Sequence, residues 1–339
     1  MTTTAPAPAP VHRAAPALPR ARGPLSAAVL DLLRGGAAPA VDVAGADPFG
    51  EDLQLALYVC YELHYRGFAG VDDELEWSPE LLSFRRSLES VFLAALREAV
   101  PGGDDLAAEI ASLVTEVPGE RGVSHHLRRR GELWQLREYI ALRSAYHLKE
   151  ADPQAWVIPR LDGHAKAALV SVEHDEYGAG RGELMHARLF GDMMLELGLS
   201  DAYGAYLDHS PAQVLAEVNF MSLAGLHRSL RGALVGQFAV VELTSSPGSA
   251  RLVAAAQRLG CGPATIGFYA EHVEADAVHE QVVRHGIIAP LVAEDPAVAA
   301  DVVFGMQAAT LLDDRLGEHV MAAWSEGRSA LVRELPAAP

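Results

Sequence analysis

The chain has 339 residues, of which 50% are hydrophobic and 21% are charged, so it can bury a large core and is neither disordered throughout nor a disulfide scaffold. Its 45 acidic residues outnumber 27 basic ones, and the formal net charge of −18 argues against binding nucleic acid or anionic lipid through phosphate contacts. Cys60 and Cys261 stand alone, which argues against a thiolate zinc site and favours a reducing, cytoplasmic location.

The chain begins with a stretch rich in proline and alanine. We expect residues 1–24 to be a disordered leader, because the stretch lacks the continuous apolar segment of a signal peptide. No apolar run approaches the roughly 18 residues that a membrane helix needs, so we predict no membrane partner.

After the leader, apolar residues recur at spacings of three and four, which predicts an all-α protein. The helical patterns cover residues 48–65, 79–100, 106–115, 125–150, 152–177, 186–197, 211–224, 226–245, 247–259 and 264–284, and a last helix begins at 295–296. Ser246 followed by Pro247 is read as a helix boundary. We assign residues 25–120 to an N-terminal helical segment that could form a homodimer, and residues 121–330 to the main bundle.

The 264–284 helix places three potential metal ligands on one face. His272, Asp276 and His279 fall at i, i+4 and i+7, which are about 0°, 40° and −20° around a helix of 3.6 residues per turn. Two imidazoles and a carboxylate suit iron, manganese or zinc. A solvated helix face is the alternative, because polar stripes are common on surface helices.

A second group of potential ligands surrounds a glycine-rich turn. His186 follows Glu183 in the Glu-x-x-His pattern of di-iron carboxylate bundles, and Glu176 lies ten positions upstream. On a straight helix Glu176 would be rotated by about 80° from His186, so both reach one metal only if the glycines at 178–182 bend or unwind the backbone. Glu176 and Glu183 therefore both remain candidates.

Two further carboxylates stand where packing alone would not favour them. Glu242 follows an apolar run, and burying an uncompensated carboxylate there would be costly. Glu150 lies in the last turn of its helix, where the helix dipole disfavours a negative charge. An exposed position on the surface is the common alternative for each of them.

These stretches together resemble a known family, the heme-oxygenase-like diiron oxidases, also described as iron-containing redox enzymes. The resemblance covers about residues 130–325 and is carried by KEADPQAW (149–156), HDEYGAGRGELMHARLF (174–190), the Glu of VVELTSSP (240–247) and HVEADAVH (272–279). It implies a heme-oxygenase-like helical bundle that binds two Fe(II) ions. The ligands that it implies are Glu150, Glu176, His186, Glu242, His272, Asp276 and His279.

The same resemblance implies a non-heme diiron oxygenase with O2 as co-substrate. With its four carboxylates, the ligand set is similar to that of the N-oxygenating members of the family, which act in natural-product pathways. The implied reaction is N-hydroxylation, or oxidation of an amine to a nitro group, on an amino-acid-derived amine or guanidine through a peroxo-diiron(III) species, and an external electron donor could take part. The alternatives are oxidative C–C cleavage or desaturation of an amino or fatty acid, and a non-catalytic iron-binding bundle.

Overall fold

The computed structural model describes residues 15–115 and 122–335, and this part of the chain contains helices and loops but no strand. The all-α fold class is therefore confirmed. The helices are α1 (Pro24–Leu33), α2 (Glu51–Glu62), α3 (Pro79–Ala99), α4 (Leu106–Val114), α5 (Val123–Arg129), α6 (Leu133–His147), α7 (Asp152–Ala155), α8 (Gly163–Glu176), α9 (His186–Glu196), α10 (Ala212–Leu226), α11 (Arg231–Leu259), α12 (Pro263–Gln281), α13 (Ala289–Glu294) and α14 (Ala299–Ser325).

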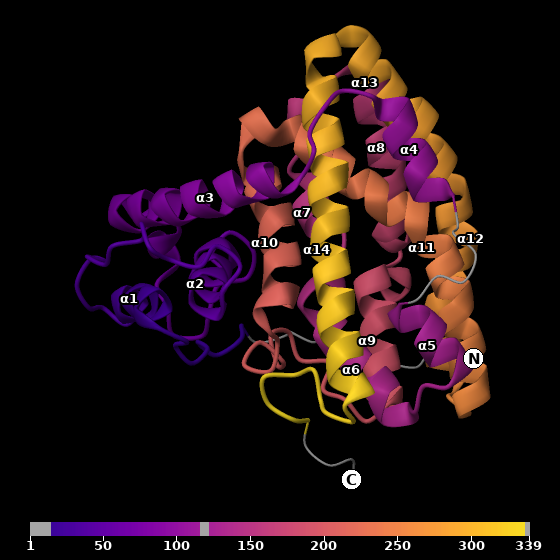
Figure 1. Ribbon diagram of the computed structural model, residues 1–339, viewed down its shortest axis with the longest axis horizontal. Coiled ribbons are helices and arrows are strands. Elements are labelled where there is room, and N and C mark those ends of the chain that lie inside the picture. The colour runs from indigo at the N-terminus through magenta and orange to yellow at the C-terminus, as the bar shows by residue number, and fades with distance from the viewer. Residues whose placement is uncertain (1–14, 116–121, 336–339) are drawn as a thin grey trace, which may run out of the picture.

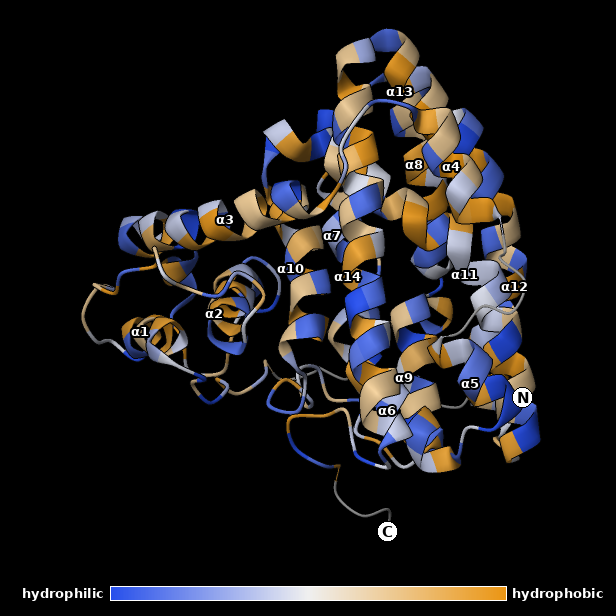
Figure 2. Cartoon of the chain, in the orientation of Figure 1, coloured by the Kyte–Doolittle hydropathy of each residue, from blue (hydrophilic) through white to orange (hydrophobic). Residues whose placement is uncertain are grey.

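The long helices form a bundle in which α11 packs against both α12 and α14. In the view of Figure 1, α14 stands in front with α10 on one side and α12 on the other, while α1, α2 and α3 extend sideways beyond α10. Figure 2 shows hydrophobic and hydrophilic residues side by side on the visible faces of these helices. Within the described ranges, no helix is long and apolar enough to cross a membrane.

A continuous apolar core joins the N-terminal helices to the bundle. Leu57 of α2 and Phe92 of α3 belong to the same buried cluster as Phe220 of α10 and Leu234 of α11. A second buried cluster lies among α6, α9 and the first turns of α12. Between them, the two clusters contain buried residues of α6, α8, α9, α11 and α12.

Residues 15–23 differ from the disordered leader that the sequence predicted. Pro16 and Pro19 are buried, and the Pro16 carbonyl accepts a hydrogen bond from the Ala69 amide at 2.8 Å. The Arg22 guanidinium donates to the carbonyl of Ser210 at 2.7 Å. Proline is apolar and has no N–H to satisfy, so a proline-rich stretch can also lie extended against a protein surface. Residues 1–14, and residues 116–121 at the expected segment boundary, lie outside the described residues.

The predicted helix boundary at Ser246 and Pro247 is wrong, because α11 runs without interruption from Arg231 to Leu259 with Pro247 inside it. A proline in a helix interior removes one backbone hydrogen bond and costs about 3 kcal/mol. Packing of α11 against α12 and α14 offsets this cost. Ser246 also donates from its hydroxyl to the Val273 carbonyl of α12 at 3.2 Å, which ties the helix to its neighbour near the proline.

Candidate metal centre

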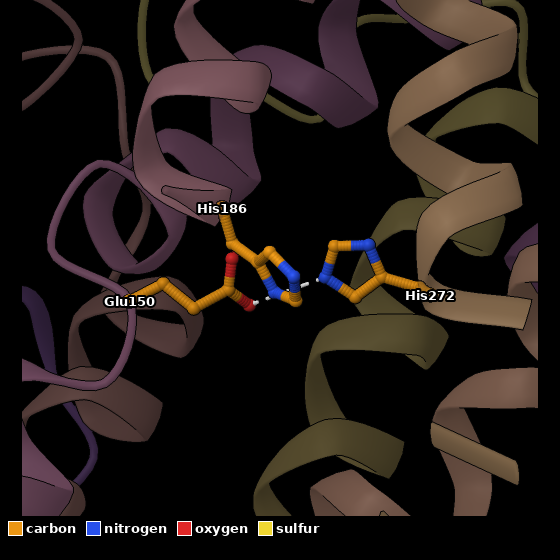
Figure 3. Close-up of side chains that lie close together, drawn as sticks. All are labelled: Glu150, His186 and His272. Atoms are coloured by element: carbon orange, nitrogen blue, oxygen red, sulfur yellow. Dashed lines mark ion pairs between the residues drawn. The ribbon is translucent and has the colours of Figure 1, made fainter. Parts of the chain in front are cut away.

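The seven residues that the sequence singled out as ligands are all buried, and their side chains gather in two groups. The first group contains Glu150, His186 and His272, and the second contains Glu176, Glu242, Asp276 and His279. In each group the potential ligand atoms lie within 4.8 Å of one another, and both groups could hold a metal ion. Figure 3 shows the first group, with Glu150 and His186 extending from one side and His272 from the other.

α12 contributes to both groups through a single stripe. His272 belongs to the first group, whereas Asp276 and His279 belong to the second. At 1.5 Å of rise per residue, His272 and Asp276 lie about 6 Å apart along the helix axis. The stripe therefore spans two neighbouring sites.

The turn between α8 and α9 brings Glu176 and His186 to the same place. α8 ends at Glu176, and the backbone then passes through residues with positive φ at Gly178 (70°), Ala179 (52°) and Gly180 (80°) before α9 begins at His186. A Cβ at Gly178 would lie 2.7 Å from the backbone of Leu184, so glycine is required there. The unwound turn replaces the straight helix that would have kept the two side chains apart.

Glu176 lies between the two groups. One of its carboxylate oxygens is 2.7 Å from Nδ1 of His186, and the other is 3.6 Å from Nδ1 of His279. The alternative candidate, Glu183, is exposed and belongs to neither group. The geometry therefore favours Glu176 over Glu183.

His272 is oriented for binding through its Nε2 atom. Its Nδ1 lies 2.8 Å from the Phe268 carbonyl, which can only accept, so Nδ1 carries the proton. Nε2 is the ring nitrogen left to bind a cation, and it faces Glu150, whose nearest oxygen is 3.8 Å away. His272 Nε2, the second oxygen of Glu150 and Oδ2 of Asp276 are buried and find no hydrogen-bond partner in the described chain. Since buried polar atoms are nearly always satisfied, these atoms fit a bound cation.

His147 supports Glu150 and was not among the predicted site residues. Its Nδ1 lies 2.8 Å from an oxygen of Glu150, and its ring stacks on Phe190 with centroids 4.8 Å apart. Burial would raise the pKa of Glu150, but His147 and then His272 hold it well below its ordinary value. In the sequence, the only indication that His147 contacts Glu150 was their spacing of one helical turn.

The second group concentrates negative charge. Burial raises the pKa of Glu242 and of Asp276, and the neighbouring carboxylate of Glu176 raises both further. The two groups together hold four carboxylates, which would balance the charge of two divalent cations. A metal ion would therefore relieve repulsion among these side chains.

Glu173 is a further buried carboxylate that the sequence analysis missed. It lies one helical turn before Glu176 on the buried side of α8, is 3% exposed, and neither of its oxygens has a hydrogen-bond partner within the described residues. It belongs to neither group of potential ligands. Its spacing of three residues from Glu176 could have indicated that it lies on the same face of the helix.

The model of a protein family described as "iron-containing redox enzyme" matches residues 137–314, a range that contains all seven residues of the two groups. No curated protein matches the chain.

Proposed function

The chain belongs to the iron-containing redox enzymes and is therefore an oxidoreductase, and from this premise we propose that it is a non-heme diiron oxygenase that uses O2 as co-substrate. The observation that carries the proposal is the convergence of seven buried donor side chains in two adjacent groups. Imidazole nitrogens combined with carboxylate oxygens suit ferrous iron.

The proposed ligand assignment follows the two groups. Glu150, His186 and His272 would hold one iron, and Glu242, Asp276 and His279 would hold the other. Glu176 would bridge them, because each of its oxygens lies close to a histidine of a different group. Four carboxylates would offset the four positive charges of two Fe(II) ions.

Two ferrous ions bound here would supply electrons for the reduction of O2 that oxygenation requires. The chain itself would hold the ligands in place and keep water out. His147 fixes Glu150, and the Phe268 carbonyl fixes His272. The rings of Phe190 and Phe268 are buried beside these histidines and form an apolar wall. Such a wall limits access of water to the ligands.

We propose N-oxygenation of an amino-acid-derived amine or guanidine as the reaction, by N-hydroxylation or by oxidation of an amine to a nitro group. The support is the ligand set with four carboxylates, which is similar to that of the N-oxygenating members. Oxidative C–C cleavage or desaturation would use the same ligands. Product analysis separates them, because N-oxygenation leaves the carbon skeleton whole.

The proposal is tested by loading the protein with Fe(II) without oxygen, counting the bound iron, and adding O2 in a stopped-flow spectrometer with candidate amines present. We expect two irons per chain and rapid O2 consumption. His272→Ala should abolish turnover while the helical circular dichroism stays largely unchanged. A protein that binds iron but does not react with O2 would instead be an iron-binding bundle.

Glu176→Gln and Glu183→Gln form a matched pair for the ligand assignment. Loss of a residue that only supports a ligand costs about 10- to 100-fold in metal affinity, so loss of the bridging ligand should cost at least as much. Glu176→Gln is expected to bind fewer than two irons, whereas Glu183→Gln should bind two. The reverse result, or full activity with fewer than two irons, would contradict the assignment.

A further inference from the structure

We propose that the N-terminal helical segment positions one of the iron ligands: the buried ion pair between Glu62 of α2 and Lys149 holds the turn that presents Glu150. The inference rests on the proposed function, since it concerns the affinity of the first group for iron. Glu62 lies outside the region matched by the family model, which begins at residue 137.

The turn that carries Glu150 is short and tightly folded. α6 ends at His147 and α7 begins at Asp152, and Ala151 between them has a φ of 74°, a left-handed conformation that residues other than glycine rarely adopt. Lys149 and Glu150 are consecutive but extend to different partners. Glu150 contacts His147 near the metal groups, whereas Lys149 pairs with α2. A shift of Lys149 would therefore also shift Glu150.

The ion pair is fully enclosed. Glu62 and Lys149 are each 1% exposed, and Nζ of Lys149 lies 3.0 Å from Oε2 of Glu62. The Tyr203 hydroxyl donates to the same oxygen at 2.9 Å. The ammonium also lies 3.9 Å from the ring centroid of Tyr65 and 4.9 Å from that of Tyr58, within cation–π range.

A second contact holds the same turn from the same side. The Arg66 guanidinium donates to the Leu148 carbonyl at 3.1 Å and lies over the ring of Tyr203 at 4.1 Å. Two consecutive residues, Leu148 and Lys149, are thus fixed by the chain segment that runs from α2 to Arg66. On its other side, Asp152 accepts a hydrogen bond from the Tyr177 hydroxyl at 3.0 Å.

Packing alone does not account for this arrangement. A buried ion pair is often no more stabilising than an apolar pair of similar volume, because both charges lose their hydration. What a charged pair with a shared tyrosine donor supplies is a fixed geometry. A ligand must be held within a few tenths of an ångström, and a fixed neighbouring side chain provides this constraint. Glu62 and Lys149 are therefore positioning residues for Glu150.

The test compares Glu62→Gln with Glu89→Gln. Glu89 is the matched control because it is also buried in the N-terminal segment, accepts a hydrogen bond from a tyrosine hydroxyl, that of Tyr61, at 3.1 Å, and pairs with a basic residue, Arg85, at 3.1 Å. Each variant leaves a cation without its carboxylate. Only Glu62 contacts the turn that carries Glu150.

Two measurements are made on the full-length protein. In an anaerobic Fe(II) titration against a competing chelator, Glu62→Gln should bind one of the two irons at least about 10-fold more weakly, and Glu89→Gln should bind both as the wild type does. In the metal-free protein, amide hydrogens of residues 148–152 should exchange faster in Glu62→Gln but not in Glu89→Gln. The second measurement needs no iron and no activity.

Unchanged iron affinity and unchanged exchange in Glu62→Gln would overturn the proposal, as would an equal loss of iron affinity in Glu89→Gln. If the wild type binds fewer than two irons, the proposed function fails, and the exchange of residues 148–152 alone decides the positioning role. Should Glu62→Gln not fold, Tyr203→Phe removes one donor to Glu62, and Tyr61→Phe is its control. The same pattern is then expected with smaller changes.

Discussion

Glu173 is buried, at 3% exposed, and neither of its carboxylate oxygens has a hydrogen-bond donor in the described chain. Burial, followed by the negative charges of Glu176 and Glu242, raises the pKa of Glu173 to about 9. A glutamate in an unfolded chain has a pKa of about 4.3. Between these two values the folded protein keeps a proton that the unfolded chain releases. Glu173 therefore makes the folded state progressively less stable as the pH rises from about 4.3 to about 9.

Glu173→Gln should remove this dependence, because glutamine stays neutral at every pH. In the metal-free protein we expect the variant and the wild type to have similar free energies of unfolding near pH 4.5. At pH 8 the variant should be more stable by up to about 4 kcal/mol, because over most of this pH range the wild type must take up a proton on folding, which costs about 1.4 kcal/mol per pH unit. Urea denaturation at both pH values measures this difference. Glu183→Gln, at an exposed position, is the control, and an equal difference at both pH values would contradict the assignment.

The sequence could predict a candidate ligand only where the spacing of residues along one helix determines which side chains lie together. The stripe of His272, Asp276 and His279 is a property of one helix, and the structure places all three side chains in the two groups. The choice between Glu176 and Glu183 depended on backbone angles in the glycine turn, which spacing does not report. Iron binding by these residues stays a prediction.

At the scale of elements, the periodicity of apolar residues located the helices better than it located their ends and the breaks between them. Pro247 was read as a boundary because a local rule cannot include the packing of α11 against two neighbouring helices. The helix predicted over 264–284 ends as an α-helix at Gln281 and continues as a π-helix over Val282–Ile288. A π-turn differs from an α-turn by about one residue, so a short apolar pattern does not separate them.

α12 should become more rigid when iron binds. It carries His272, Asp276 and His279. Without a cation, the charge of Glu176 raises the pKa of the buried Asp276, and the charge of Asp276 in turn raises the pKa of Glu242. Fe(II) would turn this repulsion into attraction, so binding free energy would stabilise the helix. Hydrogen exchange with and without Fe(II), under anaerobic conditions, should show slower exchange in α12.

α3 serves as the internal reference for that measurement, because none of the seven candidate ligands lies on it. We expect its exchange to be unaffected by iron. Equal exchange of α12 in the presence and absence of two bound irons would contradict the prediction. Slower exchange in α3 and α12 alike would indicate a general stabilisation instead.

At the scale of the whole molecule, the N-terminal helices share their core with the bundle. Leu57 and Phe92 lie in one buried cluster with Phe220, and the Asn219 side chain of α10 donates to the Gln54 carbonyl of α2 at 2.8 Å. Amphipathic patterning shows which face of a helix is apolar but not which helix covers it. For this reason the sequence could not show that the assigned segments, 25–120 and 121–330, share one core. The homodimer through residues 25–120 stays a prediction.

A shared core predicts that residues 25–120 and the bundle unfold together. Separating them would expose the apolar faces of α2, α3 and α10 to water, and burial of apolar surface is the main source of folding free energy. The four tryptophans report on both parts, since Trp77 lies in the N-terminal segment and Trp134, Trp156 and Trp324 lie in the bundle. With 5-fluorotryptophan incorporated, the four fluorine resonances of the native metal-free protein should disappear at the same urea concentration. Loss of the Trp77 resonance at a lower concentration, with the other three retained, would show instead that the N-terminal helices form a separate unit that unfolds first.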